Sequence, residues 1–357
     1  MLIEISKYVL AIALVLLFAR LSELDKFTES LKQLFIIISF SISILFNGLR
    51  FDVGIDHSIY AAIFKFFSSG DTLAIIEPGY TFLNLLFSKF DYPLGLSMVY
   101  FTCSFITFLF LYKHLIRNNI LSVGLFLAYT LGFVFYANTQ VRQFIAVAIF
   151  LWSIRFITDK QLGYYLLAIL GASMFHFSAI VLLPFYYINR FKFFQSPLKT
   201  ALFFGVIIIL TYLGFFTVIM DILARNTPYA RHLENEEYVS GFNFGGIYII
   251  WIMNFLVLLL YKNTIVSNNK NGETYYNLLY IGIAIIFISL DLRIIYRFSN
   301  YFQYLTIPCF SFLIKNKQKD KLLFYAWFIL YPLLYMMHLM ASNFLKIIPY
   351  KTIFNFL

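Results

Sequence analysis

Long apolar runs separated by short polar connectors dominate this chain. A run of about 18–20 apolar residues has the length of a helix that crosses the ~30 Å hydrocarbon core of a bilayer. The runs lack the alternation of polar and apolar positions that a membrane barrel requires. We therefore predict an all-α, polytopic integral membrane protein with about ten spanning helices. The predicted spans are 5–19, 34–49, 93–112, 120–137, 141–157, 198–220, 246–261, 275–292, 297–314 and 321–340.

One further run, 163–188, allows two interpretations: a single helix, or a helical hairpin that breaks near Ser173–Ser178. The single helix divides Lys and Arg almost evenly between the two faces. The hairpin places a clear excess on the cytoplasmic face, as the positive-inside rule requires. Pro184, which lacks an amide proton, weakens a helix in the second arm. We therefore predict a broken helix or helical hairpin at 160–192, with His176 at its tip.

The chain shows no internal repeat and no linker long enough to separate domains. We predict a single transmembrane domain over 1–357, with a larger extracytoplasmic loop at 50–92 and a smaller one at 221–245. The first run lacks a small-residue cleavage site, so we expect a retained span rather than a signal peptide. Within the larger loop, Tyr80–Phe90 is too short to cross the bilayer and is expected to lie in its interface.

Composition supports this interpretation, since 61% of the residues are hydrophobic and only 12% are charged. Soluble proteins average about 45–50% apolar and about 25% charged residues, so a soluble enzyme is excluded. The net charge of +10 comes from Lys and Arg in short connectors rather than in a contiguous basic patch. This distribution indicates control of topology and argues against nucleic-acid binding.

Ionisable residues gather on the predicted outer face, close to the ends of apolar runs. Burying a charge there costs about 2.5–3.5 kcal/mol or more, which argues for a role. The connectors concerned are 47–60, 138–143, the tip at His176, and 291–301. Simpler interpretations stay open. Arg50, Arg142 and Arg297 could simply extend their guanidinium groups to the membrane interface. Asp52 and Asp56 could form salt bridges with Arg293 and Arg297. His176 could be an ordinary hydrogen-bonded core histidine.

The residue types on this face favour phosphate and sugar chemistry. Arginine presents a rigid fork of donors that matches phosphate oxygens, and aromatic platforms beside carboxylates suit sugar rings. The chain has no Gly-rich phosphate loop and no metal-ligand spacing. We expect chemistry without cofactors, metal ions or ATP.

Five short motifs in this order resemble the EpsG family of Wzy-like polymerases of bacterial exopolysaccharide, capsule or O-antigen. They are Arg50-x-x-x-Gly54-x-Asp56-x-x-x-Tyr60, Glu77-Pro78-Gly79-Tyr80, Val141-Arg142-Gln143-Phe144-x-Ala146, Phe175-His176-x-Ser178-Ala179 and Arg297-x-x-x-Tyr301-Phe302. The resemblance implies a GT-C-like glycosyltransferase of the bacterial inner membrane, with its active site facing the periplasm or exterior. It would transfer a glycan from a polyprenyl-pyrophosphate carrier onto another lipid-linked repeat unit. Its partners would be both lipid-linked oligosaccharides, the bilayer and, as a further partner, a chain-length regulator protein.

Under this hypothesis, arginines stabilise the leaving diphosphate and one side chain removes the proton of the acceptor hydroxyl. His176 is our first candidate for the base, since its reference pKa of about 6.5 suits neutral pH; Asp56 is second and Asp52 third. Direct displacement would invert the anomeric carbon, whereas a carboxylate nucleophile would retain its configuration. The predicted substrate-binding residues are Arg50, Tyr60, Glu77, Tyr80, Arg142, Gln143, Arg293, Arg297 and Tyr301.

Two alternatives share parts of this hypothesis. A related glycan ligase, or another polyprenyl-phosphate-sugar transferase, would use the same donor chemistry with a different acceptor. A flippase or transporter of the lipid-linked oligosaccharide would bind the same substrate without chemistry. Transporters usually show repeated halves and charged residues near the middle of the membrane, and the sequence pattern shows neither.

Overall fold

The computed structural model describes residues 2–70, 76–190, 194, 196–224, 254, 257, 260–267, 270–292, 295–315 and 326–356. Within these residues the regular elements are helices, without a β-strand, and an isolated antiparallel bridge joins Arg50 to Thr352. The all-α prediction is confirmed for this part of the chain.

Four of the described helices are long and apolar enough to cross a bilayer, or up to six if each of two bent helix pairs forms one span. The four are α1 (Leu2–Ser22), α2 (Glu29–Gly48), α5 (Leu94–Arg117) and α8 (Val141–Thr158). The chain is therefore a multi-pass membrane protein. The larger count of about ten spans and the GT-C-like arrangement stay predictions.

The chain divides into two compact units. One comprises Met1–Phe156, Gln161–Leu183 and Phe310–Leu357, and the other comprises Ile157–Lys160 and Pro184–Cys309. We refer to them as the first and second unit. The prediction of a single transmembrane domain stays a prediction.

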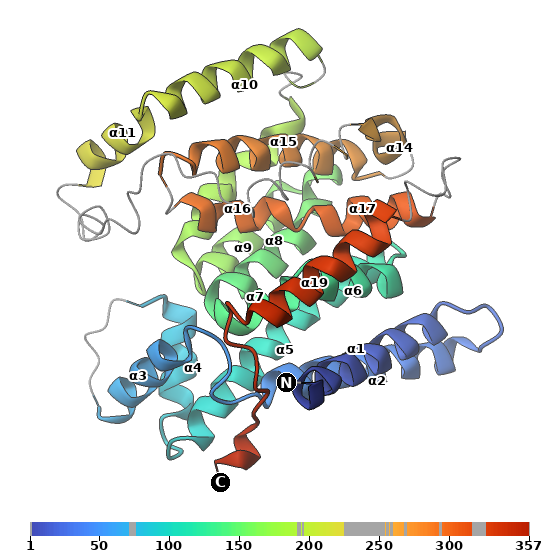
Figure 1. Cartoon of the computed structure of the whole chain (residues 1–357), viewed down its shortest axis with the longest axis vertical. Coiled ribbons are helices and arrows are strands. Elements are labelled where there is room, and N and C mark those ends of the chain that lie inside the picture. Colours follow the sequence, from blue (N-terminus) through green and yellow to red (C-terminus); the bar gives the residue numbers. More distant parts are fainter. Residues whose placement is uncertain are drawn as a thin grey trace. The chain divides into compact units, whose positions relative to one another are not determined.

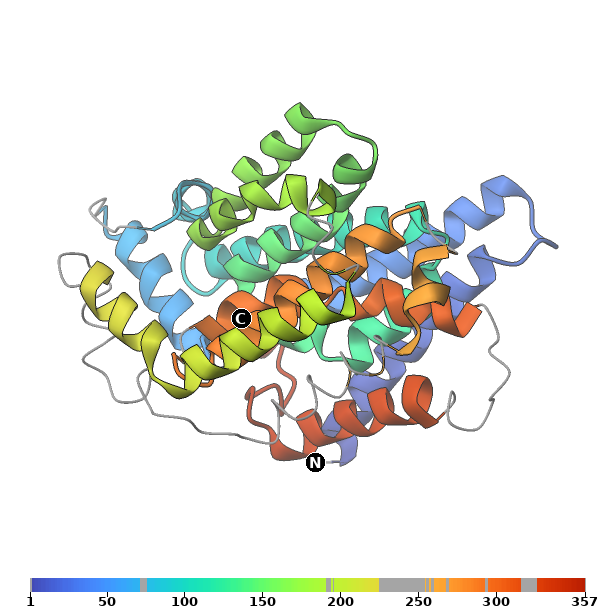
Figure 2. The ribbon, with the colours of Figure 1, turned by 90° about the horizontal axis from the view of Figure 1, so that it is seen from above.

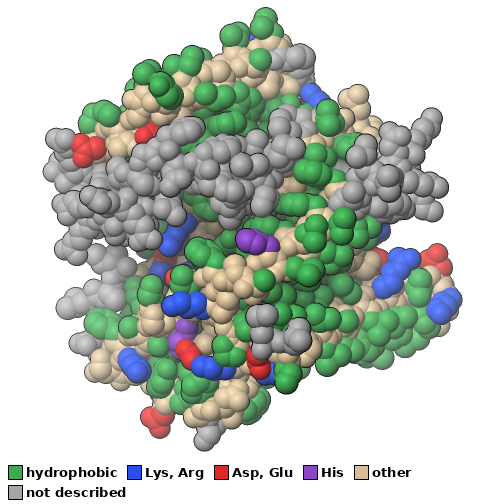
Figure 3. Space-filling model, in the orientation of Figure 1, with side chains coloured by type: hydrophobic (Ala, Val, Ile, Leu, Met, Phe, Trp, Pro, Cys, Tyr) green, Lys and Arg blue, Asp and Glu red, His purple; other side chains and the backbone are tan. Residues whose placement is uncertain are grey.

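In the first unit, α1 and α2 form an antiparallel pair, and α2 also packs against α5 (Figure 1). Thr28 ends the turn between α1 and α2. Its side chain accepts a hydrogen bond from the amide of Leu31 at 3.4 Å and so caps α2. Hydrophobic side chains cover the visible surface of this pair, while charged ones gather at its turn (Figure 3). Exposed positions such as Leu10 and Ile37 would be costly in water but suit contact with lipid.

The middle of the first unit contains a bent helix pair, α6 (Leu121–Thr130) and α7 (Phe133–Thr139), whose axes differ by 57°. Gly132 makes the bend with φ 82°, a value that favours glycine. The following helix, α8, is largely buried, unlike α1 and α2. It is therefore a core helix of the unit, and it carries Arg142 in its first turn.

The predicted outer loop at 50–92 contains two short helices, α3 (His57–Ser68) and α4 (Pro78–Phe87), which pack against each other and against α5. Tyr80 and Leu83 of α4 are buried, whereas Phe82, Leu85 and Leu86 are exposed. A helix with one buried face and one exposed apolar face is suited to the membrane interface, as predicted for Tyr80–Phe90.

The chain reverses direction after α9 (Leu162–Ser173), and a 3₁₀ helix, η1 (Phe177–Arg190), follows. The hydroxyl of Tyr165 donates to the carbonyl of Leu182 at 2.7 Å. An unbroken helix would separate these residues by about 26 Å. The predicted break near Ser173–Ser178 is confirmed, and His176 lies in the turn.

The first unit ends with a π-helical turn (Ala326–Leu330), α19 (Tyr331–Ser342), which packs against α6, and a tail that includes the 3₁₀ turn Ile353–Asn355. The tail returns to the connector after α2. The amide of Phe51 donates to Lys351 O at 2.9 Å, and the amide of Gly54 donates to Lys346 O at 2.9 Å. These bonds attach the C-terminal tail to the segment that leads into α3.

In the second unit, α15 (Gly272–Ile288) packs against α10 (Pro197–Tyr212), α14 (Lys262–Ser267) and α16 (Tyr296–Gln303). The path bends by 69° between α10 and α11 (Phe215–Ala224), where Gly214 has φ 68° (Figures 1 and 2). The predicted span 297–314 is divided at Tyr304–Leu305 between α16 and α17 (Thr306–Lys315). Most of the predicted loop 221–245 and of the predicted span 246–261 lies outside the described residues.

Candidate functional site

Three connectors of the first unit meet at the carboxylate of Glu77. Arg142 Nη1 donates to Glu77 Oε2 at 2.5 Å, and His176 Nδ1 lies 3.1 Å from Glu77 Oε1. Each carboxylate oxygen therefore has its own partner. We call Glu77, Arg142 and His176 the charged triad. These residues come from the start of α4, the first turn of α8 and the turn after α9.

The motif Glu77-Pro78-Gly79-Tyr80 explains how α4 reaches this place. Pro78 occupies the first helical turn, where its missing amide proton is not needed. The amide of Gly79 donates to Met174 O at 2.7 Å, and a Cβ on Gly79 would come within 2.8 Å of that oxygen. Only glycine therefore allows α4 to approach the turn that carries His176 so closely.

Two tyrosine rings lie beneath Arg142. Its guanidinium carbon is 6.0 Å from the ring centre of Tyr60 and 5.6 Å from that of Tyr80, and the two rings meet edge to face at 5.7 Å. Both rings are buried. They fix the guanidinium by cation–π attraction, so Tyr60 and Tyr80 act here as support for Arg142.

The charges of the triad keep Glu77 ionised. Burial by itself would raise the pKa of the Glu77 carboxyl, but the hydrogen bond with His176 and the charge of Arg142 outweigh it and lower the pKa to about 2. Glu77 is therefore a carboxylate at any physiological pH. An ionised carboxylate only accepts hydrogen bonds.

Arg50 lies over the ring of Tyr100, which meets the ring of Tyr60 edge to face at 6.2 Å. Its guanidinium is buried and donates to the carbonyl of Asn47, to Asn138 O at 3.1 Å and to Ser104 Oγ at 3.4 Å. It also lies 4.8 Å from the ring centre of Tyr100. The guanidinium thus holds two connectors together. The prediction that Arg50 binds substrate stays a prediction, although these contacts show a structural role.

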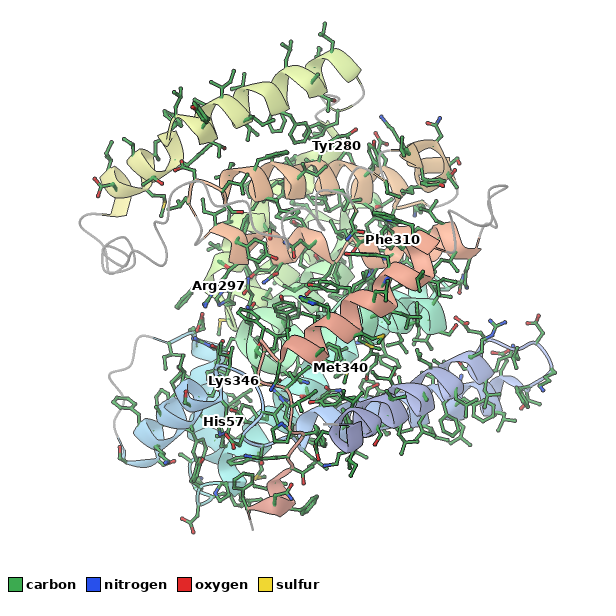
Figure 4. All side chains as sticks on the ribbon, viewed as in Figure 1. His57, Tyr280, Arg297, Phe310, Met340 and Lys346 are labelled. Atoms are coloured by element: carbon green, nitrogen blue, oxygen red, sulfur yellow. The ribbon has the colours of Figure 1, made fainter. Side chains whose placement is uncertain are left out.

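The two aspartates of the first connector have different surroundings. Asp52 is exposed, has φ 54° and pairs with Lys351 Nζ at 2.6 Å. Asp56 directly precedes α3, and the next residue, His57, has its Nδ1 3.0 Å from Tyr100 OH. In Figure 4, His57 and Lys346 mark this connector and the tail that is bonded to it. The assignments of Asp56 and Asp52 as candidate bases stay predictions.

The remaining predicted site residues are distributed over both units. Gln143 is buried next to Arg142 in α8. Arg297 is exposed at the second position of α16, where Figure 4 labels it, and Tyr301 is buried one turn further on. Arg293 lies outside the described residues. Among the described residues, no group of three or more His, Cys, Asp or Glu side chains could hold a metal ion.

Sequence reasoning missed one strong polar contact in the second unit. Asp291 accepts the amides of Phe216 and Thr217 at 2.9 and 3.1 Å, and the hydroxyl of Thr217 at 2.7 Å. Asp291 lies in the connection between α15 and α16 and caps the N-terminus of α11, so we assign it a structural role. Its separation of 75 residues from Phe216 left no local signal in the sequence.

The comparison with protein families completes this picture. The model of the EpsG family matches residues 33–352, nearly the whole chain. The chain belongs to the EpsG family. This is a family of Wzy-like polymerases, and the matched region of this EpsG-family protein includes all three residues of the triad. Comparisons with curated proteins and with solved structures gave no match.

Proposed function

We propose that this EpsG-family protein is a glycosyltransferase that lengthens a bacterial surface polysaccharide. In this proposal it transfers a glycan from a polyprenyl-pyrophosphate carrier onto another lipid-linked repeat unit, at the extracytoplasmic side of the inner membrane. Family membership supports a polysaccharide polymerase of the membrane. The carrier, the side of the membrane and the residues that act are our proposal.

The observation that carries the proposal is the charged triad. It combines a cation, Arg142, with an imidazole, His176, at contacts of 2.5 and 3.1 Å to one carboxylate. The side chains of Arg142 and His176 are 26% and 29% exposed, so both have surface for a substrate. Glycosyl transfer from a diphosphate needs both types of group, one for the leaving anion and one for the proton.

In the proposed step, the acceptor hydroxyl attacks the anomeric carbon of the donor sugar. A carbon–oxygen bond forms while the bond to the diphosphate oxygen breaks, and the carrier diphosphate leaves with that electron pair. The hydroxyl proton passes to His176 and afterwards to water, so atoms and charge balance. Direct displacement inverts the anomeric carbon.

Arg142 is our candidate for stabilising the leaving diphosphate. A guanidinium has five N–H donors in a fixed fork, so the bond to Glu77 leaves donors for phosphate oxygens. Arg293 and Arg297, which the sequence suggests as further diphosphate ligands, stay predictions. The same applies to Asp56 and Asp52 as alternatives to His176.

The test uses the purified full-length protein in detergent. The substrates are polyprenyl-diphosphate-linked repeat units, extracted from a bacterial strain in which the gene for this protein is disrupted. We expect lipid-linked chains longer than the input. Arg142→Lys keeps the charge but loses the fork, and we expect transfer to fall by about 10²-fold or more. Arg155→Lys is the control, because Arg155 lies on the same helix and stacks on Trp152 at 4.2 Å.

Two outcomes would overturn the proposal. Unchanged chain lengths, together with movement of the lipid-linked sugar across vesicle membranes, would identify a transporter. Attachment of single repeats to a different acceptor, without chain growth, would identify a ligase.

A further inference from the structure

We infer that Glu77 is a positioning residue for His176, which it holds in one tautomer and one orientation, and not a direct ligand of the glycan. The inference rests on the proposed function, because it assumes that His176 accepts a proton. It changes the role that the sequence suggests for Glu77. The argument depends on the contacts within the charged triad.

Donor and acceptor chemistry fixes the tautomer. The carboxylate of Glu77 cannot donate a proton, so the ring nitrogen 3.1 Å from its Oε1 must carry the hydrogen. This nitrogen is Nδ1. In the neutral imidazole, Nε2 then keeps its lone pair, and it is the nitrogen that can accept the proton of the acceptor hydroxyl. A carboxylate in this position also stabilises the imidazolium that forms during the step.

Burial separates the two residues by role. The side chain of Glu77 is 6% exposed, whereas that of His176 is 29% exposed. Both oxygens of Glu77 already have partners in the protein. A sugar can therefore reach the imidazole but has little access to the carboxylate behind it.

The other groups that surround the triad do not replace Glu77. Arg142 from α8 is a cation and cannot accept the Nδ1 proton. Tyr60 of α3 and Tyr80 of α4 are buried, and burial raises the pKa of Tyr60 to about 12 and that of Tyr80 well above its usual value. Both stay neutral at physiological pH. Glu77 is thus the one anion that the described contacts place against His176.

The backbone makes the arrangement rigid. The bond from the Gly79 amide to Met174 O, at 2.7 Å, joins the first turn of α4 to the residue two positions before His176. A backbone hydrogen bond therefore joins the two segments that carry Glu77 and His176, in addition to the contact between their side chains. Such support is what a general base needs in order to meet a hydroxyl in one geometry.

The experiment measures the initial rate of chain extension by the purified full-length protein, with the same extracted lipid-linked repeat units. The variants are Glu77→Gln, Glu77→Asp, His176→Gln and the double variant Glu77→Gln/His176→Gln. Glu23→Gln is the matched control, because Glu23 also joins two elements: it accepts the amide of Ser122 at 3.2 Å, at the start of α6. Thermal unfolding of each variant reports on folding.

We expect Glu77→Gln to lower the rate by about 10–10²-fold, with Glu77→Asp recovering part of it. The double variant should be no slower than His176→Gln alone, because a positioning residue has no effect without the residue it positions. Glu23→Gln should keep the wild-type rate.

Losses that multiply in the double variant, or a rate for Glu77→Asp no higher than that of Glu77→Gln, would overturn the inference. Either result is compatible with chain extension by the wild type, so the proposed function would survive it. Failure of the wild type to extend chains would instead reject the proposed function itself.

Discussion

The guanidinium of Arg50 donates to the backbone carbonyl of Asn138 at 3.1 Å. Asn138 lies near the end of α7, and the Nδ2 of its own side chain donates to Asn47 Oδ1 at 2.9 Å. Arg50 therefore links the end of α2 to the short connector that leads to Arg142. Among the described residues, no carboxylate forms a salt bridge with Arg50, so backbone carbonyls and the ring of Tyr100 hold the charge.

Replacing Arg50 by Ala should reduce stability first and activity as a consequence. The change leaves two buried carbonyl groups without a donor, each at a cost of about 1–3 kcal/mol. We expect a lower unfolding temperature for the purified protein in detergent, and a smaller decrease for Arg50→Lys. Lys65→Ala, which removes an exposed contact with Tyr92, should leave the temperature nearly unchanged. Wild-type stability with weakened donor binding would show instead that Arg50 contacts substrate.

Gly79→Ala should impair transfer through geometry alone. The added Cβ would lie 2.8 Å from Met174 O, and this backbone atom cannot move freely. The first turn of α4 must shift, and a displacement near 1 Å at a reacting site can cost about 10²-fold in rate. Gly163→Ala is the control, because a Cβ there meets nothing within 4 Å. Equal rates for the two variants would refute the close-approach role of Gly79.

The triad also predicts how stability depends on pH. The pKa of Glu77 is about 2 in the folded protein and about 4.3 in an unfolded chain. Because the folded value is the lower one, ionised Glu77 contributes its full stability above about pH 4.3, and this contribution disappears as the pH falls towards 2. The difference in unfolding temperature between wild type and Glu77→Gln should thus shrink as the pH falls below about 4. A difference that stays the same from pH 5 down to pH 3 would contradict this.

Asp291→Ala should destabilise the second unit without a direct effect on the triad. The variant loses the acceptor of two amides and one hydroxyl at the start of α11. Loss of a helix cap costs about 0.5–2 kcal/mol, visible as a lower unfolding temperature. Asp291→Asn should recover part of the loss, and Glu29→Gln, in an exposed pair with Lys32, should cost little. Equal stability of Asp291→Ala and wild type would exclude the cap.

Local patterns in the sequence predicted much of the fold. Apolar runs correctly located α1, α2, α5 and α8, because hydropathy and length depend only on neighbouring residues. The positive-inside count also favoured the break before His176, which the bond from Tyr165 to Leu182 confirms. The sequence pattern did not predict that 50–92 would form two packed helices, because each helix is short and only tertiary contacts stabilise it.

The sequence by itself determined the membrane-protein class, the family and the residue types available for chemistry. Only the tertiary structure decided which of them meet. Glu77 lies 65 residues from Arg142 and 99 from His176, and no periodicity relates positions so far apart. Their contact depends on how α4, α8 and the turn after α9 pack, and on a glycine small enough to let two backbones touch. A carboxylate assigned to the substrate from its motif is therefore, in the folded chain, the shared partner of a guanidinium and an imidazole.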